Sequence, residues 1–395
     1  MSTQYSTVIV RFGEIGIKSH QTRKRMVGLL VRHIEAALRE HRVPFSKVRR
    51  EFGRVFVETS HAKDAAGVVS RIFGVVSTSP AARVASSLAE ILTAGVELAR
   101  GHFEPRKTYA IRARRFGEHD FSSQDIREQL GSDVMTSLSN LELSVDLDEP
   151  EQTISVEVRE GNAYIFVETV NGVGGMPTGS QGKVICTISS GLDSPVAAYK
   201  VMKRGCVPVF VNFDNLPHME GECNDIAVRQ AEVLAQYIYN YEVKMYIIPH
   251  GPDLTNIIEN TPGKMTCLFC KRNMLRLARE VAVIEDADAI VTGEIIGEQA
   301  SQTSRNLRVI SDAICDYPIL RPLVGDDKVD VEHLARQIGT YRFAREATSC
   351  CSLPPRYPSV QAEPDRVKSA EENIDLSLLQ DEVANARVII LRDGN

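Results

Sequence analysis

The sequence has no tryptophan, few aromatic residues and no long apolar run. Aromatic residues make up 6% of its 395 residues, and no segment approaches the roughly 18 apolar residues that a membrane-spanning helix needs. The amino terminus has only a short apolar run before Arg11 and Glu14, unlike a secretory signal peptide. We therefore predict a cytoplasmic protein that has no membrane segment.

The absence of an export signal also argues against a disulfide framework, because disulfides persist mainly in exported proteins. Four of the eight cysteines instead form two close pairs, Cys267 with Cys270 and Cys350 beside Cys351. Such pairs are typical of metal or redox chemistry. We interpret the other four as ordinary core or surface residues: Cys186, Cys206, Cys223 and Cys315.

Acidic residues are scarce near the amino terminus, although the whole chain has a net charge of −6. Residues 1–60 contain 12 Lys or Arg against 5 Asp or Glu. Clusters such as 23–25 and 49–50 could neutralise the phosphates of a nucleic acid. A solvated surface with scattered charge explains the same composition equally well.

The length predicts more than one compact domain. Strand-like and helical segments alternate over residues 1–60 and 61–170, which predicts two small α+β domains. Five glycines interrupt any periodicity over 171–182 and indicate a linker. Residues 183–395 alternate strands and helices in the βαβ manner, which predicts an α/β domain with a mostly parallel sheet and helices on both faces.

The predicted elements are short and well separated. In the first two domains, strands are expected at 7–11, 54–59 and 108–114, helices at 21–39, 64–73, 87–99 and 123–138, and a hairpin at 153–169 with its turn at 160–162. In the third, strands are expected at 184–188, 207–213, 243–249 and 289–292.

The strand at 184–188 runs into Ser189-Ser-Gly-Leu-Asp-Ser194 and then Pro195, which suits a first helical turn. Backbone N–H groups converge at such a strand-to-helix turn, and small residues let phosphate oxygens approach closely. The carboxylate of Asp193 is placed to hold Mg²⁺. The alternative is a serine-rich turn that binds nothing. A Walker loop ending at Lys183 is rejected, because Pro177 and Val184 stand where it needs glycine and a hydroxyl.

This loop resembles that of the PP-loop pyrophosphatases, and the chain as a whole resembles the tRNA 4-thiouridine synthetase (tRNA sulfurtransferase) family. The matching segments cover nearly the whole chain: 189–197, 202–205, 292–294, 299–303, 320–323, 338–340 and the late pair Cys350-Cys351. Upstream, 112–117 and the hairpin at 156–167 resemble the family's RNA-binding THUMP domain. The resemblance implies that a ferredoxin-like domain occupies 1–60, THUMP 61–170 and the PP-loop domain 183–395.

The resemblance implies that ATP adenylates the C4 oxygen of uridine 8 in tRNA, pyrophosphate leaves, and sulfur displaces AMP. ATP and Mg²⁺ are therefore the expected cofactors, with Asp193 and Cys351 as catalytic residues. The implied ATP-binding residues are Thr187, Ile188, Ser189, Gly191, Asp193, Ser194, Asn212, Phe213, Lys271, Gly293 and Gln302. Ser190 departs from the family, which usually has glycine there, and a positive φ at that position would strain a serine.

Some family members carry a rhodanese-like domain that delivers sulfur, whereas this chain is expected to lack one because it ends at Asn395. The pair Cys267 and Cys270 resembles that of archaeal-type members, in which two cysteines and a late one hold an iron–sulfur cluster. The implied ligands of a 4Fe–4S cluster are Cys267, Cys270 and Cys351, with one iron open for sulfide. Persulfide or disulfide chemistry at Cys351, or a zinc or structural site, are the alternatives.

The expected partners are tRNA and a sulfur donor, either sulfide or a separate persulfide carrier. Arg112, Arg114 and Arg115 are expected to contact tRNA, and a homodimer is a further expectation from the resemblance. The alternative functions are thiolation of another tRNA nucleotide and non-catalytic tRNA binding. A thiamine-related role is doubtful without a rhodanese domain. His218 and His250 lie near predicted strand ends and are interpreted as surface or core residues rather than ligands.

Overall fold

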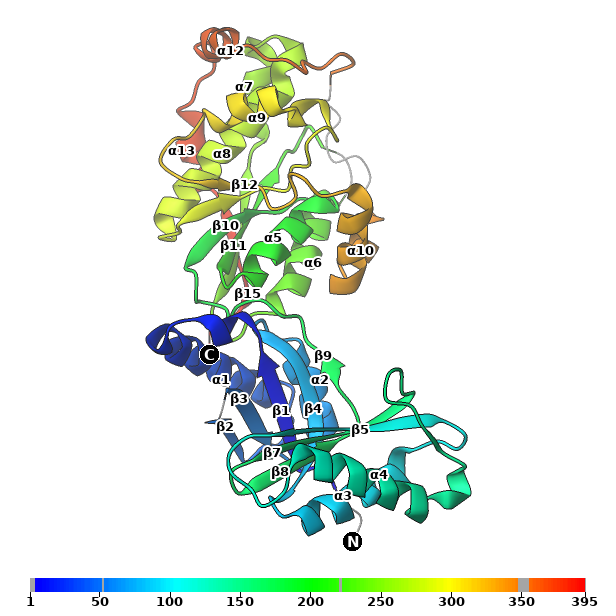
Figure 1. Cartoon of the computed structure of the whole chain (residues 1–395). Helices are drawn as coiled ribbons and strands as arrows, with labels where there is room; N and C mark the ends of the chain where they lie inside the picture. The colour runs from blue at the N-terminus through cyan, green and yellow to red at the C-terminus, as the bar shows by residue number, and fades with distance from the viewer. Residues whose placement is uncertain (1–3, 52, 220–221, 347–354, 395) are drawn as a thin grey trace. The chain divides into compact units, whose positions relative to one another are not determined.

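A computed structural model describes residues 4–51, 53–219, 222–346 and 355–394. The chain divides into two compact units, Met1–Met176 and Pro177–Asn395. Figure 1 shows the elements of each unit, which are described separately below. Among the helices within the described ranges, none has both the length and the apolar character that crossing a membrane requires.

In its described residues, the first unit consists of a single sheet with four main helices. Its strands are β1 (Thr7–Phe12), β2 (Lys47–Glu51), β3 (Arg54–Glu58), β4 (Val75–Ala85), β5 (Thr108–Arg115), β6 (Ser144–Val145), β7 (Gln152–Arg159), β8 (Asn162–Phe166) and β9 (Val170–Asn171). Its main helices are α1 (His20–Glu40), α2 (Ala62–Ser70), α3 (Leu88–His102) and α4 (Ser123–Ser137).

The sheet of this unit runs through both predicted small domains. Its order is β2-β3-β1-β4-β8-β7-β5-β6, and β9 also pairs with β4. Strand β4 pairs with β1 over most of its length and with β8 through its last four residues, so it joins the two parts. The limits of the ferredoxin-like and THUMP domains stay predictions.

Local sequence signals explain several of these elements. Ser122 and Asp125 form a reciprocal capping box at the start of α4, which satisfies backbone N–H groups that the helix leaves without partners. The predicted hairpin is confirmed: β7 and β8 pair antiparallel with Arg159 opposite Asn162. Gly161 in the turn has a φ of +74°, a conformation that glycine adopts without strain.

Over the ranges that the structure describes, the second unit is a six-stranded sheet flanked by helices. Its strands are β10 (Lys183–Thr187), β11 (Val207–Asp214), β12 (Val243–Pro249), β13 (Ala289–Val291), β14 (Ile319–Leu320) and β15 (Arg387–Arg392). Its helices are α5 (Asp193–Lys203), α6 (Cys223–Ala235), α7 (Gly251–Asn260), α8 (Thr266–Ile284), α9 (Ser304–Ser311), α10 (Lys328–Ile338), α11 (Tyr341–Ala344), α12 (Pro364–Glu371) and α13 (Leu378–Ala384).

The predicted parallel sheet is confirmed, with strand order β14-β13-β10-β11-β12-β15. All neighbouring pairs are parallel except β12 with β15, which are antiparallel. From β10 the chain adds β11 and β12 on one side, and it then crosses back to add β13 and β14 on the other side of β10. The direction in which strands are added therefore reverses between β10 and β13. Right-handed crossovers therefore place α5 and α6 on one face and α7 and α8 on the other.

The core on the α8 face holds α8 against the sheet and the late helices against α8. Buried side chains of β10, β11 and β12 pack there with α8, α9, α12 and α13. One partly buried ion cluster joins α12 to α8: Glu371 accepts hydrogen bonds from Nε and Nη2 of Arg272, at 2.7 and 2.6 Å, and from Nη1 of Arg276, at 2.8 Å. Burial alone would raise the pKa of Glu371, but the two arginines lower it to about 2.

We expect Glu371→Gln to lower the free energy of unfolding by about 2 kcal/mol at pH 7, after allowing for partial solvent screening. Because the carboxylate is stabilised in the folded state, this difference should be constant above the ordinary pKa of 4.5. It should shrink as the pH falls towards 2. Urea unfolding followed by circular dichroism at several pH values measures it. Glu363→Gln, which removes an exposed ion pair with Arg366, is the control and should change stability little. An equal loss in both variants would contradict this account.

Candidate functional site

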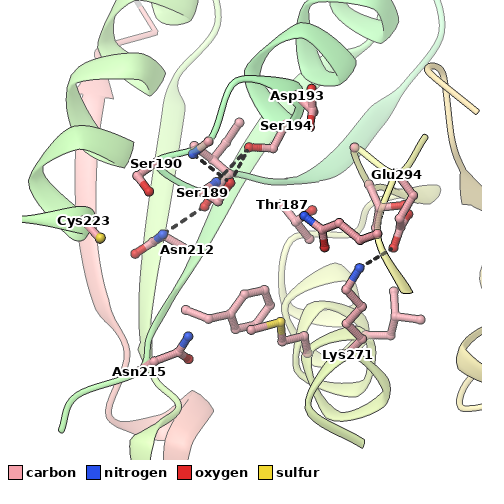
Figure 2. Close-up of a pocket in the computed structure, with 18 of the residues that line it drawn as sticks. Thr187, Ser189, Ser190, Asp193, Ser194, Asn212, Asn215, Cys223, Lys271 and Glu294 are labelled. Carbon is pink, nitrogen blue, oxygen red and sulfur yellow. Dashed lines mark hydrogen bonds and ion pairs between the residues drawn. The ribbon is translucent and has the colours of Figure 1, made fainter. Parts of the chain in front are cut away.

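A cavity of about 320 Å³ opens where β10 and β11 end and where α5 begins (Figure 2). Parallel strands place their carboxyl ends at one edge of a sheet, and a reversal of strand order leaves a crevice there. All the sequence-predicted nucleotide-binding residues line this cavity: Thr187, Ile188, Ser189, Gly191, Asp193, Ser194, Asn212, Phe213, Lys271, Gly293 and Gln302. The structure therefore brings together segments that lie more than 100 residues apart.

The loop between β10 and α5 is held by its own hydroxyl groups. The backbone N–H of Ser189 donates to Oγ of Ser194 at 2.9 Å, and the N–H of Gly191 donates to Oγ of Ser189 at 3.2 Å. The two serine Oγ atoms lie 3.0 Å apart. Ser190 is not among the residues with a positive φ, so the strain that a serine would suffer in that conformation does not arise here.

Gly293, which follows β13, packs directly on the start of α5. A Cβ at this position would lie 2.9 Å from the backbone N and Cα of Ser194. That distance is shorter than real Cβ contacts, and the atoms it meets belong to the backbone rather than to a flexible side chain. Only glycine therefore lets the segment after β13 support the loop between β10 and α5 at this distance.

Two buried amide side chains support the loop from β11 and α6. Nδ2 of Asn212 donates to the carbonyl of Ile188 at 2.9 Å, and Nε2 of Gln230 donates to the carbonyl of Ser189 at 3.1 Å. Within the described part of the chain, Oδ1 of Asn212 and Oε1 of Gln302 are buried without a hydrogen-bond partner. Both side chains line the cavity, so a ligand with amino or hydroxyl donors would satisfy them.

Asp193, the first residue of α5, and Glu298 both pair with the ammonium group of Lys328. Nζ of Lys328 lies 2.6 Å from Oδ1 of Asp193 and 2.5 Å from Oε1 of Glu298. Burial raises the pKa of Asp193 and Glu298 acts in the same direction, while Lys328 opposes them. Two carboxylates on one cation form an oxygen-donor set of the kind that Mg²⁺ prefers, so these residues fit the expected ion.

A second charged group lies across the cavity on the segment after β13. Glu294 accepts hydrogen bonds from Thr292 and, at 3.2 Å, from Nε of Arg321. Nζ of Lys271 lies 4.0 Å from its other carboxylate oxygen (Figure 2). Sequence reasoning identified Lys271 but missed Glu294 and Lys328. Glu294 stood within a matching segment, whereas no motif or spacing connected Lys328 with the loop.

The cysteine pair lies in the first turn of α8. Cys267 and Cys270 are both partly exposed, and neither forms a disulfide. Residues three apart share a helix face, so two thiols can face the same ligand. The described residues contain no group of three or more His, Cys, Asp or Glu that could hold a metal, and the expected third ligand, Cys351, lies outside them together with Cys350.

One cysteine and one histidine have positions in the fold that sequence reasoning did not predict. Cys223, interpreted as an ordinary residue, begins α6 and lines the cavity (Figure 2). His250 is a core residue as predicted, with no exposed surface, but it also contacts Cys270: its Nε2 lies 3.5 Å from the cysteine Sγ. The pattern of the sequence gave no signal for either contact, because both depend on how helices pack on the sheet.

In the first unit, two of the three arginines expected to bind tRNA share a surface. Arg112 and Arg114 line a cavity together with Arg11 and Arg127. Alternate residues of a strand point to the same face, so Arg115 lies on the other side of β5, where its Nη1 donates to the carbonyl of His119 at 3.2 Å. The prediction for Arg115 lacks this structural support.

The basic residues near the amino terminus also fall into two groups, one that lines a cavity and one that is paired within the sheet. Arg23, Lys24 and Arg50 line a second cavity with Arg54 and His20. Arg49 does not join them: only 12% of its side chain is exposed, and its Nε lies 3.0 Å from a carboxylate oxygen of Glu58. Arg49 therefore stabilises the sheet instead of offering charge to phosphates.

Family models match three consecutive parts of the chain. The model of the thiamine biosynthesis protein family (ThiI) matches residues 179–376, the THUMP domain matches 85–168, and the ThiI ferredoxin-like domain matches 7–79. The THUMP and ferredoxin-like matches lie in the first unit, and the ThiI match lies in the second.

Curated relatives match along nearly their whole length. The chain is 37% identical to a probable tRNA sulfurtransferase of Methanosarcina mazei over 98% of this chain and 95% of the relative. It is also 37% identical to one from Methanothermobacter thermautotrophicus, over 100% and 98%. A crystal structure of a 4-thiouridine synthetase in complex with RNA and bound ATP matches with a TM-score of 0.87 and 28% identity, over 98% of this chain and 100% of that one. A structure from Pyrococcus horikoshii matches with a TM-score of 0.66 and 25% identity, over 85% and 99%. The two relatives are named probable tRNA sulfurtransferases, and the chain therefore belongs to the ThiI family.

Proposed function

We propose that this protein uses ATP to transfer sulfur to uridine 8 of tRNA, giving 4-thiouridine. The observation that carries the proposal is the cavity at the end of β10, which gathers every expected nucleotide-binding residue. The full-length match to an ATP- and RNA-bound 4-thiouridine synthetase supports it.

The phosphates of ATP would bind at the loop between β10 and α5. The N–H groups of this loop and the amino end of α5 attract anions, and Gly293 keeps the supporting segment close. The buried oxygens of Asn212 and Gln302 are available to donors on the ligand. Bound Mg²⁺, held by Asp193 and Glu298, would stabilise negative charge on the phosphates and on the leaving pyrophosphate.

The reaction then proceeds in two displacements. The uracil C4 oxygen attacks the α-phosphorus of ATP, and the bond to pyrophosphate breaks. Sulfide attacks C4, AMP leaves with the former uracil oxygen, and a proton is released. A uracil oxygen is a poor leaving group and AMP a better one, so adenylation makes the exchange possible. Lys271 carries a cation at the cavity, where it can contact phosphate oxygens, and Lys328 is paired with the cavity residue Asp193.

The site from which sulfur is delivered is a further part of this proposal. Cys267, Cys270 and Cys351 would hold a 4Fe–4S cluster, and such a cluster would supply an open iron at which sulfide binds. The two described cysteines fit this donor set because both are partly exposed thiols on one helical turn. Direct chemistry at Cys351 is the alternative. A cytoplasmic location and a homodimer also stay predictions.

The direct test combines the purified protein with transcript tRNA, ATP, Mg²⁺ and sulfide without oxygen. Pyrophosphate release and 4-thiouridine, detected by nucleoside mass spectrometry, should appear together. Asp193→Asn should lower both rates by about 100-fold or more, because it removes a charge that stabilises the transferring phosphoryl group. Asp312→Asn, which changes an exposed carboxylate paired with Lys368, is the control and should keep the wild-type rates.

Three outcomes would contradict the proposal in different ways. Wild-type rates in Asp193→Asn would remove this cavity from the reaction. Thiolation at another nucleotide would favour the same chemistry with a different tRNA position. Tight tRNA binding by a wild-type protein that releases no pyrophosphate would favour a non-catalytic tRNA-binding protein.

Gly293→Ala should damage the reaction without unfolding the protein. The new Cβ would displace the backbone at Ser194, and displacements of about 1 Å at a reacting centre cost roughly 100-fold in rate. We expect kcat/KM for ATP to fall by about 10- to 100-fold, while the protein still folds with a Tm that is lower by a few degrees. Gly325→Ala is the matched control, because a Cβ there has nothing within 4 Å. Equal kinetics in the two variants would show that the contact is not needed.

The double variant Arg112→Ala/Arg114→Ala should weaken tRNA binding. Each lost phosphate contact reduces the dependence of log affinity on log salt concentration by about 0.7 to 0.9, so the loss of two contacts should reduce the slope by about 1.4 to 1.8. Fluorescence anisotropy with labelled tRNA at several salt concentrations measures it. Arg115→Ala, on the opposite side of β5, should leave the slope unchanged. A larger effect from Arg115 would reverse this assignment.

A further inference from the structure

The nucleotide cavity has apolar as well as polar walls. Its aromatic and aliphatic lining includes Phe213, Met219, Met274 and Leu275. Asn215, on the segment that follows β11, lines the same cavity. Figure 2 shows this residue far from Asp193 and Ser194, at the other end of the labelled side chains. Because a nucleotide base is flat and largely apolar, it is the part of ATP that such walls fit.

Asn215 carries an unpaired hydrogen-bond acceptor. Its Oδ1 is buried and has no hydrogen-bond partner among the residues that the structure describes. A buried acceptor without a donor costs free energy, so a ligand that brings an N–H group to it gains affinity. The amide oxygens of Asn212 and Gln302 are also unpaired, but Asn212 is bonded to the carbonyl of Ile188, just before the loop between β10 and α5. Asn215 therefore supplies an acceptor away from that loop.

The turn that carries Asn215 is fixed to the domain by its backbone. The carbonyl of Asp214 accepts the N–H of His250 at 2.8 Å, which ties the turn to the start of α7. Oδ1 of Asp214 accepts the N–H of Leu216 at 3.1 Å. A Cβ at Gly251 would collide with the carbonyl oxygen of Leu216, so the turn packs directly on α7. The Asn215 amide is thus presented from a rigid support, as a recognition group needs to be.

Adenine presents the complementary groups. Its N6 amino group can donate to Oδ1 while Nδ2 of the asparagine donates to N7, the pairing by which asparagine recognises adenine in nucleic acids. Adenine and the triphosphate are the two ends of ATP, which agrees with the separation of Asn215 from Asp193 and Ser194 in Figure 2. The reacting uracil has to meet the α-phosphorus, so its place is nearer the loop.

We infer that Asn215 is a specificity-determining residue that accepts a hydrogen bond from the N6 amino group of ATP. This inference rests on the proposed function in one respect, namely that ATP is the nucleotide bound in this cavity. It gives Asn215 no part in tRNA binding or in sulfur transfer.

The test compares ATP with purine riboside triphosphate, which lacks only the N6 amino group. Competition against a fluorescent nucleotide, with Mg²⁺ and without tRNA, measures the dissociation constant of each. Wild-type protein should prefer ATP by about 10- to 100-fold, because the analogue leaves the buried acceptor unpaired. Asn215→Leu has nearly the same shape and no acceptor. In this variant the preference should disappear, because ATP binds more weakly while the analogue does not.

Two further variants separate this role from a general effect on the cavity. Asn215→Asp keeps the acceptor oxygens and should keep most of the preference, because its added charge repels the triphosphates of both nucleotides equally. Asn385→Leu changes an exposed asparagine whose Nδ2 donates to the carbonyl of Asp381 at 2.8 Å. This control should bind both nucleotides as wild-type protein does.

Equal weakening of both nucleotides in Asn215→Leu would show a purely structural role and overturn the inference. An unchanged preference in that variant would also overturn it, as would a higher KM for tRNA alone, because the acceptor would then serve the uracil. Wild-type protein that prefers ATP but releases no pyrophosphate with tRNA would contradict the proposed function and leave the role of Asn215 intact. Pyrophosphate release with no preference between ATP and the analogue would do the reverse.

Discussion

The contact between Gly293 and the start of α5 determines the form of the nucleotide cavity. The phosphate loop belongs to the first strand of the sheet, whereas Gly293 follows the fourth along the chain, and the two meet because β13 lies beside β10. Because Gly293 has no side chain, its backbone packs directly on the backbone of Asp193 and Ser194. This contact supports the loop that precedes α5. The glutamate that follows, Glu294, is thereby held at the cavity wall.

Charge balance is the second constraint, because the proposed polyphosphate ligand would bind in a cavity lined by the carboxylates of Asp193 and Glu294. Glu294 is paired with Arg321 on one side, while Asp193 and Glu298 share Lys328 on the other. Paired carboxylates repel phosphate less than isolated ones, and a divalent cation or a lysine can exchange partners when ATP enters. This balance explains how an acidic wall is compatible with an anionic substrate.

Much of this architecture could be predicted because its signals are local. The strand–loop–helix at 184–203 combines an apolar run, small residues and a proline at the first helical turn, and the hairpin before 170 has a glycine turn. Other elements lack such signals. Strand β2 has the sequence KVRRE, and β4 contains Pro80 in the interior of a sheet, where proline is disfavoured. Strand β15 pairs antiparallel at an edge after a long separation in sequence, which no local pattern reveals.

The same distinction separates the site residues that sequence reasoning found from those it missed. Loop residues belong to a motif, but the partners of Asp193 and Cys270 come from helices whose packing is set by the whole domain. Lys328 begins α10, and His250 precedes α7. Each supplies a charged or polar group to a residue with a recognisable pattern. Because that contribution depends on distance and burial rather than on spacing, the chemistry of the recognised residues becomes specific only in the folded domain: a carboxylate shares its cation, and a cysteine sulfur lies beside a buried imidazole.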